Sequence, residues 1–177
     1  MSQIKVNSIV PAGGLPAGAN GGIIQVVQAT QTSEVSTTGT SFVDTGLSGT
    51  ITPSSNSSKI LVMVTQRFFI SRSTDQARAG FQLLRGSTVI LTGPNTASGS
   101  EPGGEGFSSG NGPSAIQVAG AYSCSFLDSP STTSATTYKT QFANNQSSAS
   151  PTIFINSLNN NSGEDGVSTI TLFEVSV

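Results

Sequence analysis

The chain has 177 residues, of which 9% are charged, and it contains neither histidine nor tryptophan. Soluble domains usually carry about 25% charged residues, so hydroxyl and amide side chains must keep this surface hydrated. The formal net charge of −2 gives no basic surface for nucleic acid, and no apolar stretch approaches the roughly 20 residues of a membrane span, so we expect no nucleic-acid partner, no membrane span and a protein made in a cytoplasm.

Residues 1–22 differ in composition from the rest of the chain. A short β-like stretch leads into a run of proline and glycine, which cannot form a helix and lacks side chains for a core. We predict an extended N-terminal arm that anchors a domain at residues 23–177, with a disordered terminus as the alternative. Four apolar side chains favour the arm and are candidate assembly contacts: Ile4, Val6, Ile9 and Val10.

From residue 23 onward the sequence alternates between strand and turn patterns. No window keeps a helical period for three turns, so the domain is predicted to be all-β. The first strands are expected at Ile23–Ala29, Ser41–Thr45 and Leu47–Thr52, with a Ser/Thr-rich turn after the first.

The stretch Lys59–Ile70 predicts the central strand of the domain. Its β-branched and aromatic residues favour a strand over a buried helix. Successive residues of a strand point to opposite faces, and here both faces are largely apolar. One face must pack on the core, and the other needs a second layer or a neighbouring subunit. The candidate assembly contacts on this second face are Leu61, Met63 and Phe69.

The middle of the chain predicts a hairpin and then a long loop. Ala77–Arg85 is expected to turn tightly through Gly86 into Thr88–Thr92. Gly93–Pro113 is rich in glycine and proline, and no core strand is expected there. A loop of this length is usually functional or disordered, and both alternatives stay open. Its candidate exposed contacts are Glu101, Glu105 and Phe107.

The last third of the chain resumes the strand pattern and places Cys124 in an apolar stripe. Strands are expected at Ser114–Leu127, Thr136–Phe142, Pro151–Ser157 and Val167–Val177, with a polar hairpin at Asn159–Gly166. Eight to ten strands at hairpin spacing fit a single antiparallel β-sandwich of jelly-roll-like type. Strand order does not follow from the pattern.

No catalytic, cofactor-binding or metal-binding residue is predicted. Without histidine, a Ser-His-Asp triad or a His-based metal site is impossible. Cys124 alone cannot hold a metal, and its apolar neighbours indicate a small buried core residue. A glycosidase needs only two carboxylates, but the nine acidic residues are scattered mostly over loops, as solvated acids are. We therefore expect no enzyme and no cofactor.

Eight short phrases, in this order along the chain, carry a family resemblance. They are Ile4–Ile9, Ile23–Val27, Ser41–Leu47, Ile51–Pro53, Ser58–Val62, Leu84–Ser87, Ser125–Pro130 and Ile170–Val175. Together they resemble small virion structural proteins, described as capsid decoration or tail-fibre-like proteins, of tailed phages of cyanobacteria and other marine bacteria. The resemblance implies a virion component assembled in the host cytoplasm, with other virion proteins of the capsid or tail as partners.

Two functions from different classes follow from these expectations. The first is a surface accessory protein of the capsid decoration or cement type, anchored by residues 1–22. The alternative is a tail-fibre or host-receptor module that binds a surface glycan or receptor. Sugars stack on aromatic rings, yet Phe107 is the one clear loop aromatic, which favours the structural role. A carbohydrate-active enzyme ranks third.

The two apolar faces of Lys59–Ile70 also predict self-association. Large exposed apolar patches are rare on monomers, and closed rings are the usual result of such association. We expect a homotrimer that buries one face of this strand, or of the apolar C-terminal strand, between subunits. The choice of three copies comes from the resemblance to trimeric phage proteins.

Overall fold

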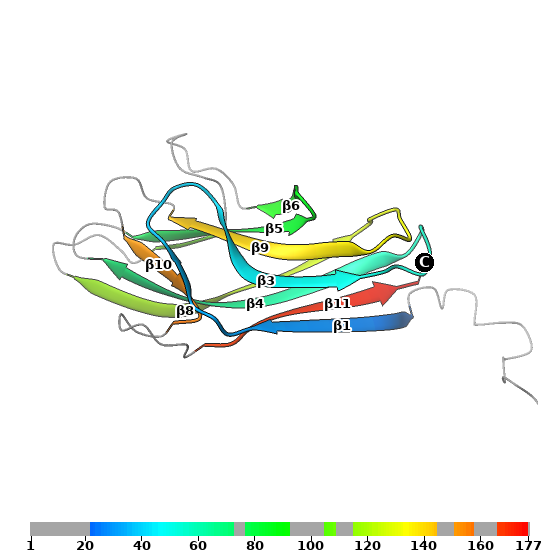
Figure 1. Cartoon of the computed structure of the whole chain (residues 1–177), viewed down its shortest axis with the longest axis horizontal. Helices are drawn as coiled ribbons and strands as arrows, with labels where there is room; N and C mark the ends of the chain where they lie inside the picture. Colours follow the sequence, from blue (N-terminus) through cyan, green and yellow to red (C-terminus); the bar gives the residue numbers. More distant parts are fainter. Residues whose placement is uncertain are drawn as a thin grey trace, which may run out of the picture.

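The computed structural model describes residues 22–72, 77–92, 105–108, 115–144, 151–157 and 166–176, with the backbone alone at 105–108 and 116. These residues form two antiparallel sheets that pack face to face (Figure 1). No helix occurs among them, so none of the described segments is a helix that could cross a membrane. The predicted all-β sandwich is confirmed.

Sheet A has six strands. They are β1 (Ile23–Gln31), β2 (Val35–Thr37), β4 (Lys59–Arg72), β8 (Ile116–Asp128), β10 (Thr152–Ile155) and β11 (Ser168–Val175). The 14-residue β4 is its centre. One edge of β4 pairs first with β11 and then with β10, and the other edge pairs with β8 along its length. The predicted central position of this strand is therefore confirmed.

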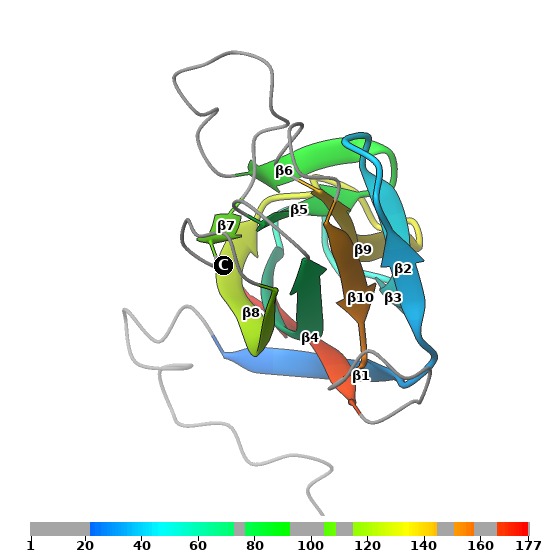
Figure 2. The same ribbon diagram turned by 90° about the vertical axis from the view of Figure 1, so that its left-hand side faces the viewer.

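Sheet B has five strands. They are β3 (Val43–Ile51), β5 (Arg78–Arg85), β6 (Thr88–Thr92), β7 (Glu105–Ser108) and β9 (Thr136–Asn144). Their order is β3-β9-β5-β6, and β7 pairs with the part of β5 that precedes the β6 pairing. In Figure 2 the two sheets are seen from one end of the sandwich, with β5, β6 and β9 above β4 and β8.

The strand order is that of a jelly roll. Four long strands of sheet A, in the order β1-β11-β4-β8, face four of sheet B, in the order β3-β9-β5-β6. The chain crosses repeatedly between the sheets, so most neighbours within a sheet are distant in sequence. Jelly rolls of eight strands and two sheets occur in viral capsid and lectin domains.

The core lies between the sheets and consists of the inward side chains of β3, β4, β5, β8, β9, β10 and β11. The rings of Phe81 and Tyr122 stack across it with centroids 4.8 Å apart. Gly120 on β8 faces the ring of Phe68 on β4, and a Cβ at Gly120 would lie 2.7 Å from its Cζ. Glycine is needed here because a neighbouring strand's ring occupies the side-chain space.

A chain of buried polar groups crosses the core from sheet B to sheet A. The hydroxyls of Thr45 and Thr140 are 2.6 Å apart, and Thr140 Oγ1 donates to Gln66 Oε1 at 2.8 Å. Gln66 Nε2 donates to Ser168 Oγ at 2.6 Å, and Ser168 Oγ donates to Asn156 Oδ1. Buried polar groups without partners are costly, and these satisfy one another.

Three elements differ from the sequence-based expectation. The expected loop at Gly93–Pro113 contains the short strand β7, and the expected turn after β1 contains β2. The two strands expected around Gly46 form one strand, β3, with an irregularity between Asp44 and Ser48 where Gly46 has φ +85°. By contrast, the tight hairpin at Gly86 is confirmed, with φ +59° and the pair Arg85–Thr88 closing it.

The two ends of the described chain meet at one end of sheet A. The backbone N–H of Ser176 donates to the carbonyl of Gly22 at 3.0 Å, and β1 pairs with β11 from this point. Figure 1 shows the start of β1 beside the tip of β11, where the C-terminus is marked. The predicted arm, residues 1–22, lies outside the described residues except for Gly22, at which it joins β1.

Candidate functional site

The structure places the predicted assembly contacts of β4 on the outer face of sheet A, but it separates Phe69 from the other two. Leu61 is half-buried and Met63 is exposed, whereas Phe69 is 2% exposed. The ring of Phe69 packs against Phe154 of β10 with centroids 5.9 Å apart. Phe69 is therefore covered within the chain by Phe154, which leaves little of its ring accessible, and its proposed assembly contact stays a prediction.

The other predicted contacts fall outside what the structure describes. The structure does not describe the four apolar residues of the arm, which are Ile4, Val6, Ile9 and Val10. Glu101, in the segment before β7, also lies outside the described residues. Glu105 and Phe107 lie on β7, which pairs with β5, but their side chains are not described. Their proposed contacts stay predictions.

An apolar row runs straight across the outer face of sheet A. Directly paired residues of antiparallel strands point to the same face. Val26 pairs with Phe173, Phe173 with Leu61, and Leu61 with Leu127, so four apolar side chains from β1, β11, β4 and β8 stand in line. We call these four residues the apolar row. Val26 and Leu127, at its two ends, are 54% and 51% exposed.

More apolar surface adjoins the row at the edge of the sheet. Ile23 pairs with Val175, next to the row, and Ile24 occupies the register shift between Ile23 and Gln25. Both isoleucines are exposed. Sequence reasoning did not single out Val26, Phe173 or Leu127. The alternation of Phe173 and Val175 with inward apolar residues was a visible signal, but combining the three residues required the strand register.

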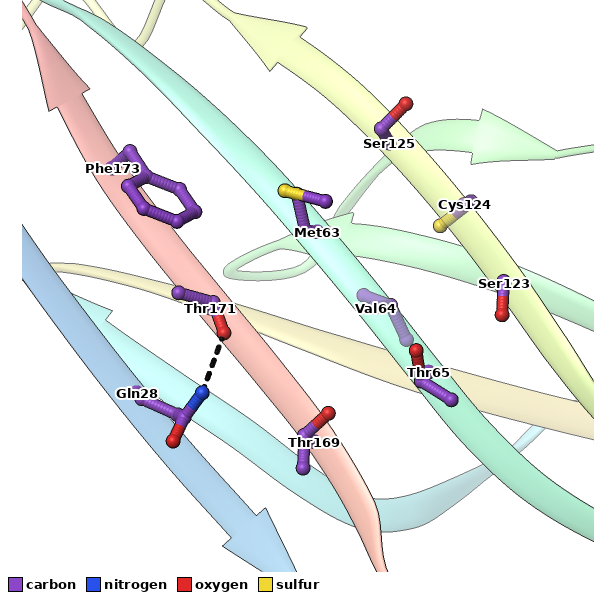
Figure 3. Close-up of a pocket in the computed structure, with 10 residues that line it drawn as sticks. All are labelled: Gln28, Met63, Val64, Thr65, Ser123, Cys124, Ser125, Thr169, Thr171 and Phe173. Atoms are coloured by element: carbon purple, nitrogen blue, oxygen red, sulfur yellow. Dashed lines mark hydrogen bonds between the residues drawn. The ribbon is translucent and has the colours of Figure 1, made fainter.

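Beside the apolar row lies an open groove of about 510 Å³ (Figure 3). Figure 3 shows two further cross-strand lines at this groove, one with Met63 at its centre and one with Thr65. Gln28 Nε2 donates to Thr171 Oγ1 at 3.0 Å. The described side chains that line the groove are all uncharged: Gln28, Met63, Val64, Thr65, Ser123, Cys124, Ser125, Thr169, Thr171 and Phe173.

Cys124 belongs to the inward stripe of β8, as predicted. It is half-buried and packs against the core beside Val64, its paired residue on β4. Its surroundings in the groove are apolar or hydroxylated, and none of the described side chains that line the groove with it is basic.

The outer face of sheet B has the opposite character. Lys139 Nζ lies 2.9 Å from Asp44 Oδ2, and Gln141 Nε2 donates to Asp44 Oδ1 at 2.6 Å. Burial of the Asp44 carboxyl raises its pKa. The hydrogen bonds from Lys139 and Gln141, together with the charge of Lys139, lower the pKa by more than burial raises it, so the net pKa is below its ordinary value. Sheet B thus presents paired polar groups to water, while the outer face of sheet A carries the apolar row and the groove, with Lys59 and Arg67 of β4 on either side of them.

Two buried carboxylates, those of Asp128 and Glu174, accept hydrogen bonds from neighbouring parts of the fold. Asp128 accepts two hydrogen bonds from Arg85 Nη1 at 2.9 Å and one from the Tyr138 hydroxyl at 2.7 Å. Burial first, and then the hydrogen bond to Asp128, raise the pKa of Tyr138 above its ordinary value. The cluster ties the ends of β5, β8 and β9 together.

Glu174, the second of these carboxylates, holds the turn before β4. The backbone N–H and the hydroxyl of Ser54 donate to its Oε1 at 2.6 and 2.7 Å. Burial raises the pKa of Glu174, but hydrogen bonds from Ser54 and Ser58 and from the backbone outweigh this and leave it below its ordinary value. Both acids are buried, and no group of three potential metal-binding side chains occurs in the described part of the chain.

Comparisons with known proteins identify no family. No protein-family model and no curated protein sequence matches the chain. Among solved structures, it is similar to one titled "Structure of infectious bursal disease virus Gx strain", with a TM-score of 0.36 and 14% identity. The match covers 86% of this chain and 37% of that chain, so this chain spans less than half of its length. A TM-score this low supports no functional conclusion.

Proposed function

We propose that this chain is a non-enzymatic structural protein of a virus particle, a surface accessory of the capsid decoration type anchored by residues 1–22. The observation that carries the proposal is the contrast between the ion-paired outer face of sheet B and the apolar row on the outer face of sheet A. A protein that attaches to a lattice needs one face for contact and one for water. An enzyme needs a cluster of reactive groups, and the buried acids described above are bound by structural partners.

The position of Gly22 supports the anchoring role of the arm. The arm joins β1 at the end of sheet A where Ile23, Ile24 and the apolar row lie. The hydrogen bonds between Ser176 and Gly22 hold this point against β11. An anchor that starts here would bring the apolar face of sheet A toward the surface to which it attaches. The resemblance to phage virion proteins agrees with this role.

Removal of residues 1–21 tests the anchor. The truncated chain is expected to keep the far-ultraviolet circular dichroism and unfolding transition of the full chain, because β1 begins at Ile23 and pairs with β11. It is expected to be absent from virus particles purified from producing cells, as measured by mass spectrometry of the particles. Loss of the fold would contradict the arm, and normal incorporation would contradict its anchoring role.

Immunogold labelling of intact particles with the full chain tests the location. Labelling over the whole capsid is the expected result. Labelling confined to the tail tip would favour the second candidate function, and unlabelled particles would contradict a virion role altogether.

The second candidate, a receptor- or glycan-binding module of a tail fibre, is favoured by the groove of sheet A. Its hydroxyls and the amide of Gln28 could hydrogen-bond a neutral sugar, and Phe173 offers an aromatic ring beside them. Chemical-shift changes at Thr171 and Phe173 on titration with neutral oligosaccharides would support it. The wild-type chain and a Thr171→Val variant would be compared, with Thr50→Val on sheet B as the control.

A further inference from the structure

We propose that the groove on the outer face of sheet A binds a sugar chain that carries carboxylate groups, with Arg67 as the residue that holds a carboxylate. The inference rests on the second candidate function, a glycan-binding module, and deepens it by naming the chemical class of the glycan. Binding of such a sugar is a property of the purified chain. It can therefore be tested without a virus particle or a host cell.

The first observation is a line of hydroxyl side chains that crosses four strands of sheet A. Thr30 of β1 pairs with Thr169 of β11, and Thr169 pairs with Thr65 of β4. Thr65 pairs in turn with Ser123 of β8. Directly paired residues point to the same face, and Figure 3 shows three of these four side chains together at the groove. We call these four residues the hydroxyl line, in which each group can donate and accept a hydrogen bond, as sugar hydroxyls can.

The second observation is that the groove offers both space and an aromatic wall beside this line. Its volume of about 510 Å³ lies within the roughly 300–1,000 Å³ of typical small-molecule sites. Phe173 lines it on the side of the apolar row, and the amide of Gln28, which donates to Thr171, lies next to it. A sugar ring can thus stack on an aromatic ring while its hydroxyls bond to polar side chains.

The third observation is the exposed side chain of Arg67 next to the groove. Arg67 lies on the same face of β4 as Thr65 and roughly 7 Å further along the strand, since Gln66 between them is buried in the core. Its neighbours are small, because it pairs with Ala121 of β8 and a Cβ at Gly166 would lie 3.2 Å from the Arg67 Cβ. Among the described residues, its guanidinium has no hydrogen-bond or ion-pair partner.

This combination selects a sugar with negative charge over the alternatives. A guanidinium holds a carboxylate through two parallel hydrogen bonds, and none of the described side chains that line the groove is acidic and would repel it. A neutral sugar would leave Arg67 unused. An acidic peptide would pair with Arg67 but has no ring of hydroxyls to match the hydroxyl line. A sugar ring that bears both hydroxyls and a carboxylate uses both parts of the site.

Nuclear magnetic resonance titration of the full chain with tetragalacturonic acid tests the proposal. The methyl ester of the same tetramer is the matched probe, because it keeps the rings and their hydroxyls and removes only the charge. Chemical-shift changes are expected at the backbone amides of Thr65, Arg67 and Ser123. The ester is expected to bind at least about tenfold more weakly than the acid, since it cannot form the charged pair with Arg67.

Arg67→Gln is the principal variant, and it should weaken binding of the acid by about tenfold or more. Lys59→Gln is its matched control, because Lys59 is a cation on the same face of β4 but on the far side of the apolar row. Its effect should stay within about twofold.

Thr65→Val tests the hydroxyl line and should weaken binding by about threefold. Thr50→Val on sheet B is the control and should leave binding unchanged. Circular dichroism of each variant establishes that the fold is intact.

Four results would overturn the proposal. The first is the absence of any shift at about 10 mM tetragalacturonic acid. The second is equal affinity for the acid and its ester, which would show a site for neutral glycans. The third is an equal loss in Arg67→Gln and Lys59→Gln, which would show unspecific attraction between charges. The fourth is equally tight binding of tetraglutamate, which would show a site for acidic peptides.

Two further outcomes separate this site from its setting. Binding that appears only in Glu164→Gln or Asp165→Asn would show that an acid preceding Gly166 in the sequence occupies Arg67, and it would contradict the proposal for the wild type. Binding of the acid by the wild type, together with labelling over the whole capsid, would contradict the tail-fibre role and leave the site standing.

Discussion

Individual polar residues in this sandwich hold loops and strand ends in place. Glu174 is 1% exposed and accepts hydrogen bonds from the turn that precedes β4. A buried carboxylate without partners would have a raised pKa, and here the partners reverse that effect. The acid therefore contributes stability as long as it is ionised.

Glu174→Gln is expected to lower the free energy of unfolding at pH 7 by about 2 kcal/mol, because a charged acceptor is replaced by a neutral one. The pKa of Glu174 is lower in the folded chain than its ordinary value of 4.5. Its contribution is thus fully present above pH 4.5 and is lost as the pH falls through the folded pKa. Denaturant unfolding between pH 7 and 3 should show this loss in the wild type, and the variant should lack it.

Asp44→Asn is the control for Glu174→Gln. The Asp44 side chain is 54% exposed in its ion pair with Lys139, so solvent screens it and its loss should cost about 0.5 kcal/mol. An effect of Glu174→Gln as small as this one would contradict the role assigned to the buried carboxylate.

At the scale of elements, Gly120 makes the close pairing of β8 with β4 possible. The ring of Phe68 fills the space where a side chain of residue 120 would stand. Gly120→Ala is expected to lower the free energy of unfolding by about 1–3 kcal/mol through overpacking. In Gly39→Ala the nearest atom to the new Cβ would be Thr37 Oγ1 at 3.5 Å, so denaturant unfolding should show little change. Equal effects of the two substitutions would contradict the packing argument.

The polar chain that crosses the core couples β9 to β4. Gln66→Leu leaves the Thr140 hydroxyl without its acceptor, and Thr140→Val leaves Gln66 Oε1 without its donor. Each should cost about 1–3 kcal/mol, while the double variant removes both partners and should cost less than the sum by at least about 0.5 kcal/mol. Chemical denaturation of the four proteins measures this.

Thr50→Ala is the control for this comparison of single and double variants. The Thr50 hydroxyl bonds to Thr137 and shares no partner with Gln66, so its effect should add to that of Gln66→Leu. Additivity within the Gln66 and Thr140 pair itself would contradict coupling through the core.

The local sequence pattern was sufficient to predict most strands, but not to predict which side chains the strands bring into contact. Alternation located β4 and its two faces, and the tight turn at Gly86 followed from turn chemistry. The burial of Phe69 could not be predicted, because it depends on Phe154 of β10, a strand far along the chain. The strand β7 was missed because pairing with β5, rather than its own Gly-rich sequence, defines it. For the same reason the apolar row became visible only once the register joined Val26, Phe173 and Leu127.

At the scale of the whole molecule, the jelly roll separates two surfaces of different physical character. The outer face of sheet B carries the Asp44–Lys139 ion pair with its amide partner. The outer face of sheet A carries the apolar row and the hydroxyl-lined groove. Because both faces belong to one sandwich, contact on one side leaves the other in water. The proposed role on the surface of a particle requires such a division between a contact face and a hydrated face.

A homotrimer with the apolar row as its contact, as expected from the sequence, should respond to salt as a neutral apolar contact does. Raising NaCl from 0.1 M to 1 M shortens the Debye length from about 10 Å to about 3 Å, which weakens association between charged faces but has no charge to screen along the apolar row. Sedimentation equilibrium at the two salt concentrations should therefore give the same association constant within about twofold, and sodium sulfate should strengthen association because it favours apolar burial.

The nearest charged side chains of β4 on this face are Lys59 and Arg67, one on either side of the row and groove. Dissociation at 1 M NaCl would contradict the apolar row as the contact and would instead assign association to these two residues, a result that Lys59→Gln and Arg67→Gln would then reproduce at low salt.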